Sequence, residues 1–384
     1  MIYLDNASTT KPKRQVINAM MPYFTDEWYN PSSLYSKASE IKKDVEAARK
    51  TVANYINADS NEIYFTSGGS EGNCWAIQGF VNHCIANNAR PCVITSSIEH
   101  KSIIDCVNNL NNSYVYFIDV DKEGFINIAQ LKNTLMRLSN SHITDILVSI
   151  QFANNEIGTI QHIKEIAEVV HRFNGVFHTD AVQAFGHIPI DVKELGIDML
   201  TASGHKIGTP KGVGFLYKES SVKIDPLIYG SQMDGMRGGT ENVPYIIGMA
   251  KAVGLIKKDD EYQLRLTVLR NNFIAQLKSL GCFVNGSVEE RLPNNINVTF
   301  LSNVSGEALI YMLDTAGIYL SSGSACNSRS IEPSHVLKAI GLSNEEAMKT
   351  IRITIPDNIT MEEIDKAMYE ISKAIKIIDC GGDL

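Results

Sequence analysis

One lysine stands where a covalent reaction with an aldehyde is chemically feasible. Lys206 lies in the glycine-flanked stretch SGHKIGTPKG (203–212), directly after the strand-like run DMLTA (198–202). Loops at strand ends hold the functional groups of parallel sheets. A lysine held away from water has a lowered pKa and forms a Schiff base with an aldehyde cofactor. Because a loop lysine is more often a solvated charge, the neighbouring motifs must decide between these interpretations.

Pyridoxal phosphate is the aldehyde cofactor that such a lysine holds, and it makes further demands on the protein. Its ring nitrogen needs a carboxylate to stay protonated, its phosphate needs N–H and hydroxyl donors, and a flat group covers the ring. The sequence offers a candidate for each demand, and each candidate follows a strand-like run.

The candidate carboxylate lies in HTDAVQAFG (178–186). Asp180 is expected to hold the proton of the ring nitrogen, and Gln183 to reach the phenolic oxygen of the ring. An aspartate at the end of a strand is as often a helix N-cap, so Asp180 alone does not identify the site.

The candidate phosphate site is FTSGGSEGN (65–73), which passes from a strand into a predicted helix through glycines. Such a passage presents backbone N–H groups and the positive end of a helix dipole to an anion. His100, in SIEHKS (97–102), follows another strand, where an imidazole can stack on the ring and transfer protons. The ordinary alternatives are a plain turn for the glycines and a packed or capping histidine.

Composition and charge narrow the class of protein. The 384 residues are 44% hydrophobic and 20% charged, which is typical of a chain with one large and one smaller globular domain. The net charge of −8 argues against a nucleic-acid or anionic-membrane partner. The opening MIYLDNASTT has no basic segment followed by an apolar run, and no later stretch resembles a membrane span, so we expect a cytoplasmic protein.

The seven cysteines form no disulfide framework and no zinc-site spacing; they stand at 74, 84, 92, 106, 282, 326 and 380. This pattern predicts free thiols in a reducing compartment, most of them packed as small apolar residues. Cys326 differs, because SSGSACNSRSIEPSH (321–335) is rich in serine and poor in apolar anchors. No motif suggests a metal site.

The elements that must position these residues follow an α/β pattern. Between 63 and 217, short β-branched runs alternate with amphipathic stretches, which predicts a mostly parallel sheet with helices on both faces. The strand candidates are 62–66, 92–96, 114–118, 145–150, 175–179, 198–202 and 212–217. Helix-rich sequence over 248–280 leads to a smaller α+β domain with strands at 295–300 and 351–355 and a helix at 361–378.

Taken in order, the motifs resemble those of cysteine desulfurases of the NifS/IscS type, fold-type-I pyridoxal-phosphate enzymes in the class V aminotransferase family. The motifs that carry the resemblance are YLDNASTT, YNPSS, SGGSEGN, SIEH, ANNEIG, HTDAVQ, SGHK, GMRGGTEN, SSGSAC and IRITI. They extend over essentially the whole chain. The resemblance implies a large cofactor-binding domain at 13–255 and a small domain formed by 1–12 and 256–384, with the catalytic cysteine loop at 321–335.

The resemblance implies a role for each matching residue. Lys206 would form the Schiff base, and Asp180 and Gln183 would contact the ring. His100 would stack on the ring as an acid or base. The phosphate would be held by Gly69, Ser70, Ser203 and His205, and by Thr240 of the other subunit of a homodimer.

The implied substrate is L-cysteine. Asn155 would lie beside the ring and the substrate, and Arg352 would receive the substrate carboxylate, although residue type alone does not favour it over Arg237. Cys326, on a poorly ordered loop at the mouth of the site, would take the sulfur as a persulfide, releasing alanine. A base or cation should activate this thiol, and Arg329 and His100 are both candidates.

Several alternatives and departures stay open. An aminotransferase, a β-eliminating enzyme or a selenocysteine lyase would share every residue except the dependence on Cys326, and a scaffold protein would need none of them. The serine-rich loop resembles the longer loop of housekeeping iron–sulfur assembly desulfurases rather than the shorter loop of selenocysteine lyases. The sulfur acceptor, such as an iron–sulfur scaffold or a thiolation enzyme, stays open. The sequence departs from the usual pattern at Tyr35, at QMD (232–234) and at Pro356, and the second of these puts dimer details in doubt.

Overall fold

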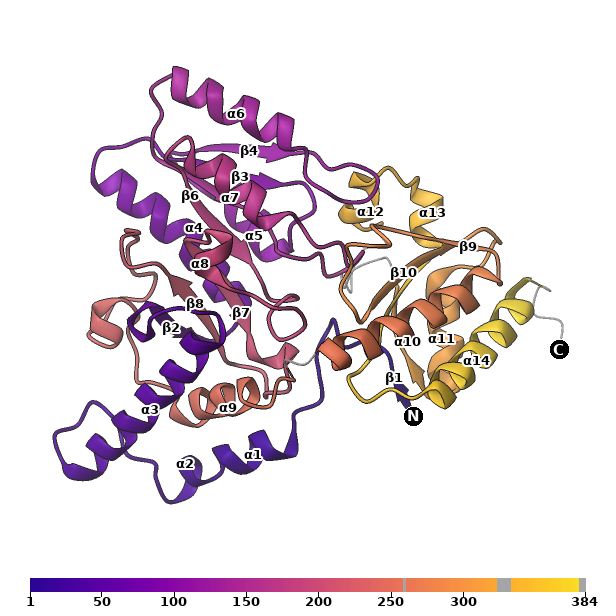
Figure 1. Cartoon of the computed structure of the whole chain (residues 1–384), viewed down its shortest axis with the longest axis horizontal. Helices are drawn as coiled ribbons and strands as arrows, with labels where there is room; N and C mark the ends of the chain where they lie inside the picture. The colour runs from indigo at the N-terminus through magenta and orange to yellow at the C-terminus, as the bar shows by residue number, and fades with distance from the viewer. Residues whose placement is uncertain (258–259, 323–332, 380–384) are drawn as a thin grey trace.

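The computed structural model describes residues 1–257, 260–322 and 333–379 (Figure 1). Its larger part is built on a seven-stranded sheet of order β2-β8-β7-β6-β5-β3-β4. The strands are β2 (Ile63–Thr66), β3 (Cys92–Ser96), β4 (Tyr114–Ile118), β5 (Ile146–Ser149), β6 (Val176–Asp180), β7 (Met199–Ser203) and β8 (Gly214–Lys218). Each strand overlaps the run that predicts it.

The direction of the strands decides where functional residues gather. Strands β4, β3, β5, β6 and β7 pair in parallel, whereas β8 runs antiparallel to both β7 and β2. Strand β2 therefore points the same way as the parallel strands, and only β8 is reversed. The prediction of a mostly parallel α/β sheet is confirmed, and the carboxyl ends of β2, β3, β5, β6 and β7 meet at one edge.

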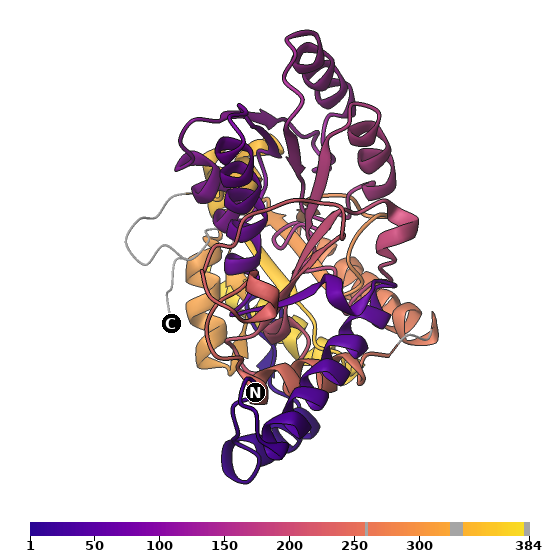
Figure 2. The ribbon, with the colours of Figure 1, turned by 90° about the vertical axis from the view of Figure 1, so that its left-hand side faces the viewer.

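Both faces of this sheet are buried, because alternate residues of each strand enter different apolar cores. In β5, Ile146 and Val148 join one core and Leu147 joins the other. Figure 2 shows the helices to either side of the strands. The helices of the larger part are α1 (Arg14–Met20), α2 (Pro22–Thr25), α3 (Ser36–Tyr55), α4 (Gly69–Ala86), α5 (Lys101–Asn108), α6 (Ile128–Asn140), α7 (Ile163–His171), α8 (Val192–Leu195) and α9 (Val243–Val253).

The smaller part has an antiparallel sheet of order β12-β13-β10-β9. Its strands are β9 (Cys282–Val284), β10 (Asn295–Phe300), β12 (Ser321–Ser322) and β13 (Thr350–Thr354), and its helices are α10 (Asp260–Lys278), α11 (Gly306–Thr315), α12 (His335–Ala339), α13 (Asn344–Met348) and α14 (Met361–Asp379). The sequence predicts β10, β13 and α14, while β9 and β12 are too short for a periodic signal. The 248–280 stretch is divided between α9 and α10.

The start of the chain packs with its end. Strand β1 (Ile2–Tyr3) pairs in parallel with β11 (Ile318–Tyr319). Ile2 and Leu4 belong to the same apolar core as residues of β10, β13 and α14. The N-terminal segment then crosses to the larger part, where α1 packs against α9. The boundaries at 13 and 256 remain a prediction. Among the described residues, no helix is long and apolar enough to cross a membrane.

The sheet core gives a stability prediction. Phe177 of β6 is fully buried, whereas Phe117 of β4 is 39% exposed. Phe177→Ala leaves a cavity at the centre of the sheet and should lower the free energy of unfolding by about 3–5 kcal/mol. Phe117→Ala should cost much less, because water already reaches that ring. Urea unfolding of both variants tests this, and equal losses would contradict the burial pattern.

Candidate active site

The candidate residues gather at the edge where the strands have their carboxyl ends. A cavity of about 530 Å³ lies there, between this edge and the smaller part of the chain. Its lining includes the predicted residues Gly69, Ser70, His100, Asn155, Asp180, Gln183, Ser203, His205, Lys206 and Arg352. Residues at carboxyl ends meet in parallel sheets whatever their separation in sequence, which explains why motifs so far apart share one cavity.

Lys206 ends a single 3₁₀ turn (Gly204–Lys206) that follows β7. Its Nζ donates hydrogen bonds to the backbone oxygens of Ala7 and Ser8 from the N-terminal segment. Burial, together with the nearby positive charge of Arg352, lowers the pKa of Lys206 to about 8, although Asp5 and Asp180 oppose the shift. The amine is therefore partly neutral near physiological pH, as attack on an aldehyde requires.

Asp180, the last residue of β6, is fixed by two donors. Its Oδ1 accepts from the backbone N–H of Val182 at 2.9 Å, and its Oδ2 accepts from Asn73 Nδ2 of α4 at 2.7 Å. The first contact is the local turn that any aspartate at a strand end can make. The second joins β6 to α4 and orients the carboxylate in the cavity wall.

His100 both caps a helix and lines the cavity. Its Nδ1 accepts from the backbone N–H of Ser102 at 3.1 Å, at the start of α5, and lies 2.8 Å from Ser102 Oγ. Ser102 Oγ in turn accepts from Asn73 Nδ2 at 3.0 Å. Because Nδ1 is an acceptor, the neutral ring carries its proton on Nε2. The capping and functional interpretations of His100 are thus compatible.

The anion-binding elements are the start of α4 and the turn after β7. Gly69 is the first residue of α4, whose first-turn N–H groups have no acceptor within the helix. A Cβ at Gly69 would stand 2.7 Å from Val182 Cγ2, so only glycine allows this close approach of α4 to the turn after Asp180. His205 contacts Thr9 Oγ1 at 3.2 Å, and burial lowers its pKa to about 4, which makes it a neutral donor or acceptor.

Arg352, in the middle of β13, reaches the cavity from the smaller part. Its Nη2 donates to Asp5 Oδ1 at 2.7 Å, Ser8 Oγ at 2.9 Å and Ser321 Oγ at 3.1 Å. Nη1 donates to the backbone oxygen of Asn155 at 3.2 Å. Within the described part of the chain, its buried Nε has no hydrogen-bond partner. The guanidinium is therefore held in place at the cavity lining.

Arg237, the competing arginine, has a different partner. Its Nε donates to Glu71 Oε1 of α4 at 2.9 Å. The structure therefore brings Arg352, and not Arg237, to the cavity with Lys206. This choice depends on the pairing of β13 with β10 and could not be made from residue type.

Two buried carboxyl groups in the cavity wall were missed by the sequence interpretation. Burial raises the pKa of Glu99 to about 8, and Gln151 N–H donates to both of its oxygens. Burial also raises the pKa of Glu156, whose Oε2 accepts from Ser334 Oγ at 2.5 Å. His335 Nε2 donates to the backbone oxygen of Glu99 at 2.9 Å.

These contacts join the residues that follow the cysteine segment to the cavity wall. Glu99, Glu156 and His335 all stand inside stretches that the sequence analysis singles out, SIEH, ANNEIG and SSGSACNSRSIEPSH. The signal was therefore present, but nothing in the sequence shows that the three motifs meet. Asn73 and Asp5, also missed, lie in SGGSEGN and YLDNASTT.

Three residues that the sequence analysis assigns to the site are not among the described residues of the cavity lining. Cys326 and Arg329 lie outside the described residues, so the predicted loop and its activation stay predictions. Thr240 is exposed and, among the described residues, is not part of the cavity lining. Its predicted place beside another subunit's phosphate is untested by a single chain.

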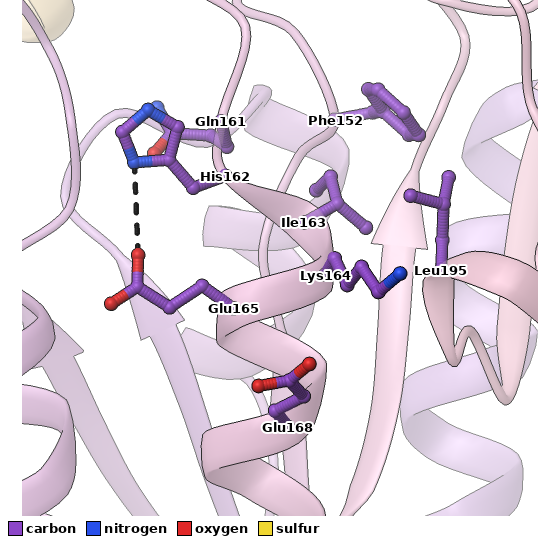
Figure 3. Close-up of a pocket in the computed structure, with 8 residues that line it drawn as sticks. All are labelled: Phe152, Gln161, His162, Ile163, Lys164, Glu165, Glu168 and Leu195. Atoms are coloured by element: carbon purple, nitrogen blue, oxygen red, sulfur yellow. Dashed lines mark ion pairs between the residues drawn. The ribbon is translucent and has the colours of Figure 1, made fainter.

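A second hollow, of about 490 Å³, lies at the start of α7 (Figure 3). Its charged residues include Lys164 and Glu165, and His162 Nδ1 lies 3.9 Å from Glu165 Oε2. Lys164 pairs with Glu194 at 3.8 Å, with both side chains more than half exposed. None of the predicted site residues lines this hollow, so it is not the candidate active site.

The residues of the first cavity fit pyridoxal phosphate. A partly neutral lysine amine, a fixed carboxylate and an anion-binding helix start share one cavity, and its size lies in the usual range for cofactor sites. Gly69 begins α4 and lines the cavity, so the first N–H groups of this helix are available there to a phosphate.

Comparison with known proteins agrees with this geometry. The family model described as aminotransferase class-V matches residues 2–367. A solved structure titled "NIFS-LIKE PROTEIN" superimposes with a TM-score of 0.89 at 32% identity, covering 98% of this chain and 99% of that one. The chain belongs to the class-V aminotransferase family, whose members are in general pyridoxal-phosphate enzymes.

The comparisons also define the group within the family. The chain is 44% identical to "Cysteine desulfurase IscS" of Methanosarcina thermophila over 98% of its length and 92% of the relative. It is 42% identical to the protein of the same name from Dictyoglomus turgidum, over 98% and 94%. A structure titled "SspA in complex with cysteine" matches with a TM-score of 0.82 at 33% identity, covering 94% of this chain and all of that one. The chain belongs to the cysteine desulfurases.

The lowered pKa of Lys206 gives a pH prediction. Because only the neutral amine reacts with an aldehyde, cofactor uptake by the cofactor-free protein should accelerate as the pH rises through about 8. The Arg352→Gln variant should need a higher pH, because it removes one positive charge that lowers this pKa. The absorbance of lysine-bound cofactor, followed across a pH series, measures both midpoints.

Arg237→Gln is the matched control, since Arg237 pairs with Glu71 away from the cavity lining. It should leave the midpoint unchanged. A wild-type midpoint near that of an ordinary lysine, above pH 10, would contradict the burial of the amine.

Proposed function

We propose that this chain removes sulfur from L-cysteine with pyridoxal phosphate, releases L-alanine, and carries the sulfur as a persulfide on Cys326 to an acceptor protein. The observation that carries the proposal is the convergence of Lys206, Asp180 and Arg352 on one cavity. Each group would serve the bound cofactor or the substrate. Lys206 would bond the aldehyde of the cofactor, Asp180 would contact its ring nitrogen, and Arg352 would bind the carboxylate of the amino-acid substrate.

The cofactor would be held by residues that follow several strands of the seven-stranded sheet and line the cavity. Lys206 would bond its aldehyde carbon, Asp180 its ring nitrogen and Gln183 its phenolic oxygen. Its phosphate would meet Gly69, Ser70, Ser203 and His205, and the imidazole of His100 would cover the ring. When bound, pyridoxal phosphate supplies an electron sink for the carbanion formed at the substrate Cα.

Arg352 would orient the substrate. A guanidinium binds a carboxylate through fixed, parallel N–H donors, and Arg352 belongs to the cavity lining. Asn155 lies beside it, because its backbone oxygen accepts from Arg352 Nη1. The contacts of Nη2 with Asp5 and Ser8 keep the guanidinium from turning away from the cavity.

Lys206 and His100 would move the protons. With a pKa of about 8, the Lys206 amine would accept the proton of the substrate Cα and would return a proton later. His100 would present Nε2–H to the ring, because its Nδ1 accepts from the backbone N–H of Ser102. Lys206 therefore has a lone pair available near neutral pH.

Cys326 would take the sulfur. Its thiolate attacks Sγ of the substrate, so the substrate Cβ–Sγ bond breaks and a sulfur–sulfur bond forms on the enzyme. Overall, enzyme thiol and L-cysteine give enzyme persulfide and L-alanine, with no net oxidant or reductant. Whether Arg329 or His100 activates the thiol stays open.

The acceptor would be an iron–sulfur scaffold or a thiolation enzyme. A persulfide passes its outer sulfur to another thiol by exchange, which requires reduced partner thiols. We therefore place the enzyme in the cytoplasm, where thiols are kept reduced.

Replacing Cys326 by serine tests the activity. The variant should lose sulfide release from L-cysteine in the presence of a reductant by about 100-fold or more, since a nucleophile is removed. Alanine and sulfide are measured together, and trapping with an alkylating reagent reports the persulfide. Cys282→Ser, which changes a buried cysteine of β9, is the matched control and should keep the activity.

The outcome separates the alternatives. Activity that survives Cys326→Ser would overturn the sulfur-transfer role and favour β-elimination or selenocysteine lysis. A keto acid product with cofactor left in its amine form would indicate transamination.

We further propose that the working unit is a homodimer. Thr240 lies outside the described lining of its own cavity, as expected for a residue that completes another subunit's site. Exposed large apolar side chains also lie between α2 and α3 and beyond β8, including Trp28 at 67%, Leu34 at 104% and Tyr229 at 78%. Aromatic rings stacked at a surface, such as Trp28 on Tyr29, are typical of protein interfaces.

Mixing two inactive variants tests this arrangement. Lys206→Ala removes the Schiff-base lysine, and Thr240→Glu sets a negative charge against the partner's phosphate. In a mixed dimer, one of the two cavities keeps Lys206 and receives a native Thr240. Random re-association makes about half of the dimers mixed, so refolding the variants together should restore up to about one quarter of the wild-type activity per cavity. The absence of any recovery, with dimers seen by sedimentation, would contradict a site shared between subunits.

A further inference from the structure

Two cysteines outside the proposed reaction face each other across the contact of α4 and α5. Cys74 Sγ, on α4, lies 3.7 Å from the backbone oxygen of Ser102, one helical turn before Cys106 on α5. The side chains of Cys74 and Cys106 also interact directly, and each shifts the pKa of the other. Cys74 is partly exposed, whereas Cys106 is 5% exposed within the apolar core between the two helices.

The pair is electrostatically unlike the other described cysteines. The hydrogen bond from Cys106 lowers the pKa of Cys74 to about 7, although burial and Asp105 oppose the shift. The same bond and burial raise the pKa of Cys106. Burial raises the pKa of Cys84 and Cys92 to about 12 and that of Cys282 to about 11. Cys74 is thus the thiol that reacts first among the described ones.

The thiol pair lies beneath the hydrogen bonds that hold the cavity wall. Asn73, next to Cys74, donates to both Asp180 and Ser102. Ser102 supplies the oxygen near Cys74 and also contacts His100. Both helices begin at the cavity, so the pair is close to the site without being part of its lining.

We propose that Cys74 and Cys106 form a reversible dithiol–disulfide pair, a modification site separate from Cys326. A hydroperoxide is the oxidant. The Cys74 thiolate attacks one peroxide oxygen, the O–O bond breaks, and a sulfenic acid forms on Cys74 with release of water or an alcohol. Cys106 then attacks that sulfur, its proton leaves with the hydroxyl group as water, and a disulfide joins α4 to α5. The two thiols lose two electrons, which the peroxide gains.

The experiment uses the holoenzyme with Cys326→Ser and Cys380→Ser, which removes the two thiols that lie outside the described residues. The protein is treated with stoichiometric hydrogen peroxide, alkylated, and digested without reductant. Mass spectrometry should find peptides of Cys74 and Cys106 joined, two hydrogens lighter than their sum, and separated again by dithiothreitol. This measurement does not depend on desulfurase activity, so it tests the disulfide separately from the proposed function.

Cys84→Ser, on the same helix as Cys74, is the matched control and should keep the link, whereas Cys74→Ser and Cys106→Ser should lose it. A second measurement needs no oxidation: alkylation of Cys74 by iodoacetamide should reach half its maximal rate near pH 7, and near pH 8.5 in Cys106→Ala, which leaves no donor at position 106. Over-oxidation of Cys74 without a link, or an unreactive Cys74 in the intact pair, would overturn the proposal.

Discussion

The site depends on one physical constraint: a lysine amine must be kept from water and still remain available to react. Lys206 satisfies it because the N-terminal segment lies over the turn after β7 and accepts its hydrogen bonds through Ala7 and Ser8. Burial and Arg352 together bring its pKa to about 8. Carbonyl oxygens accept the hydrogen bonds of the amine. A carboxylate in their place would favour the charged form of the lysine and raise its pKa.

The same N-terminal segment joins the two parts of the chain at the cavity. Asp5 neutralises the buried Arg352 of β13, while Ala7 and Ser8 accept from Lys206. A buried arginine without such a partner would be costly, and removing one member of a buried pair is far more destabilising than the pair is stabilising. The ion pair thus fixes the position of the guanidinium, which is the geometric requirement for receiving a carboxylate.

Several residues of the wall serve structure and chemistry at once. His100 caps α5 and lines the cavity, and Asp180 closes a local turn while it accepts from Asn73. Structural and functional interpretations of such residues do not exclude each other. The cap fixes the free nitrogen of His100, and the turn and Asn73 fix the direction of the Asp180 carboxylate. The packing of α4 on α5 is therefore the support on which both groups depend, and it also brings Cys74 to Cys106.

The sequence by itself determined the α/β class, the strands from β2 to β8 and the motifs that contain the cavity residues, because strand periodicity and glycine turns are local signals. It did not determine which arginine reaches the cavity, nor that Glu99, Glu156 and His335 meet there. Those contacts join residues far apart in the chain, such as Asp5 with Arg352 and Glu156 with Ser334. Only strand order and the packing of the two ends of the chain bring them together, and no local pattern encodes a long-range pairing.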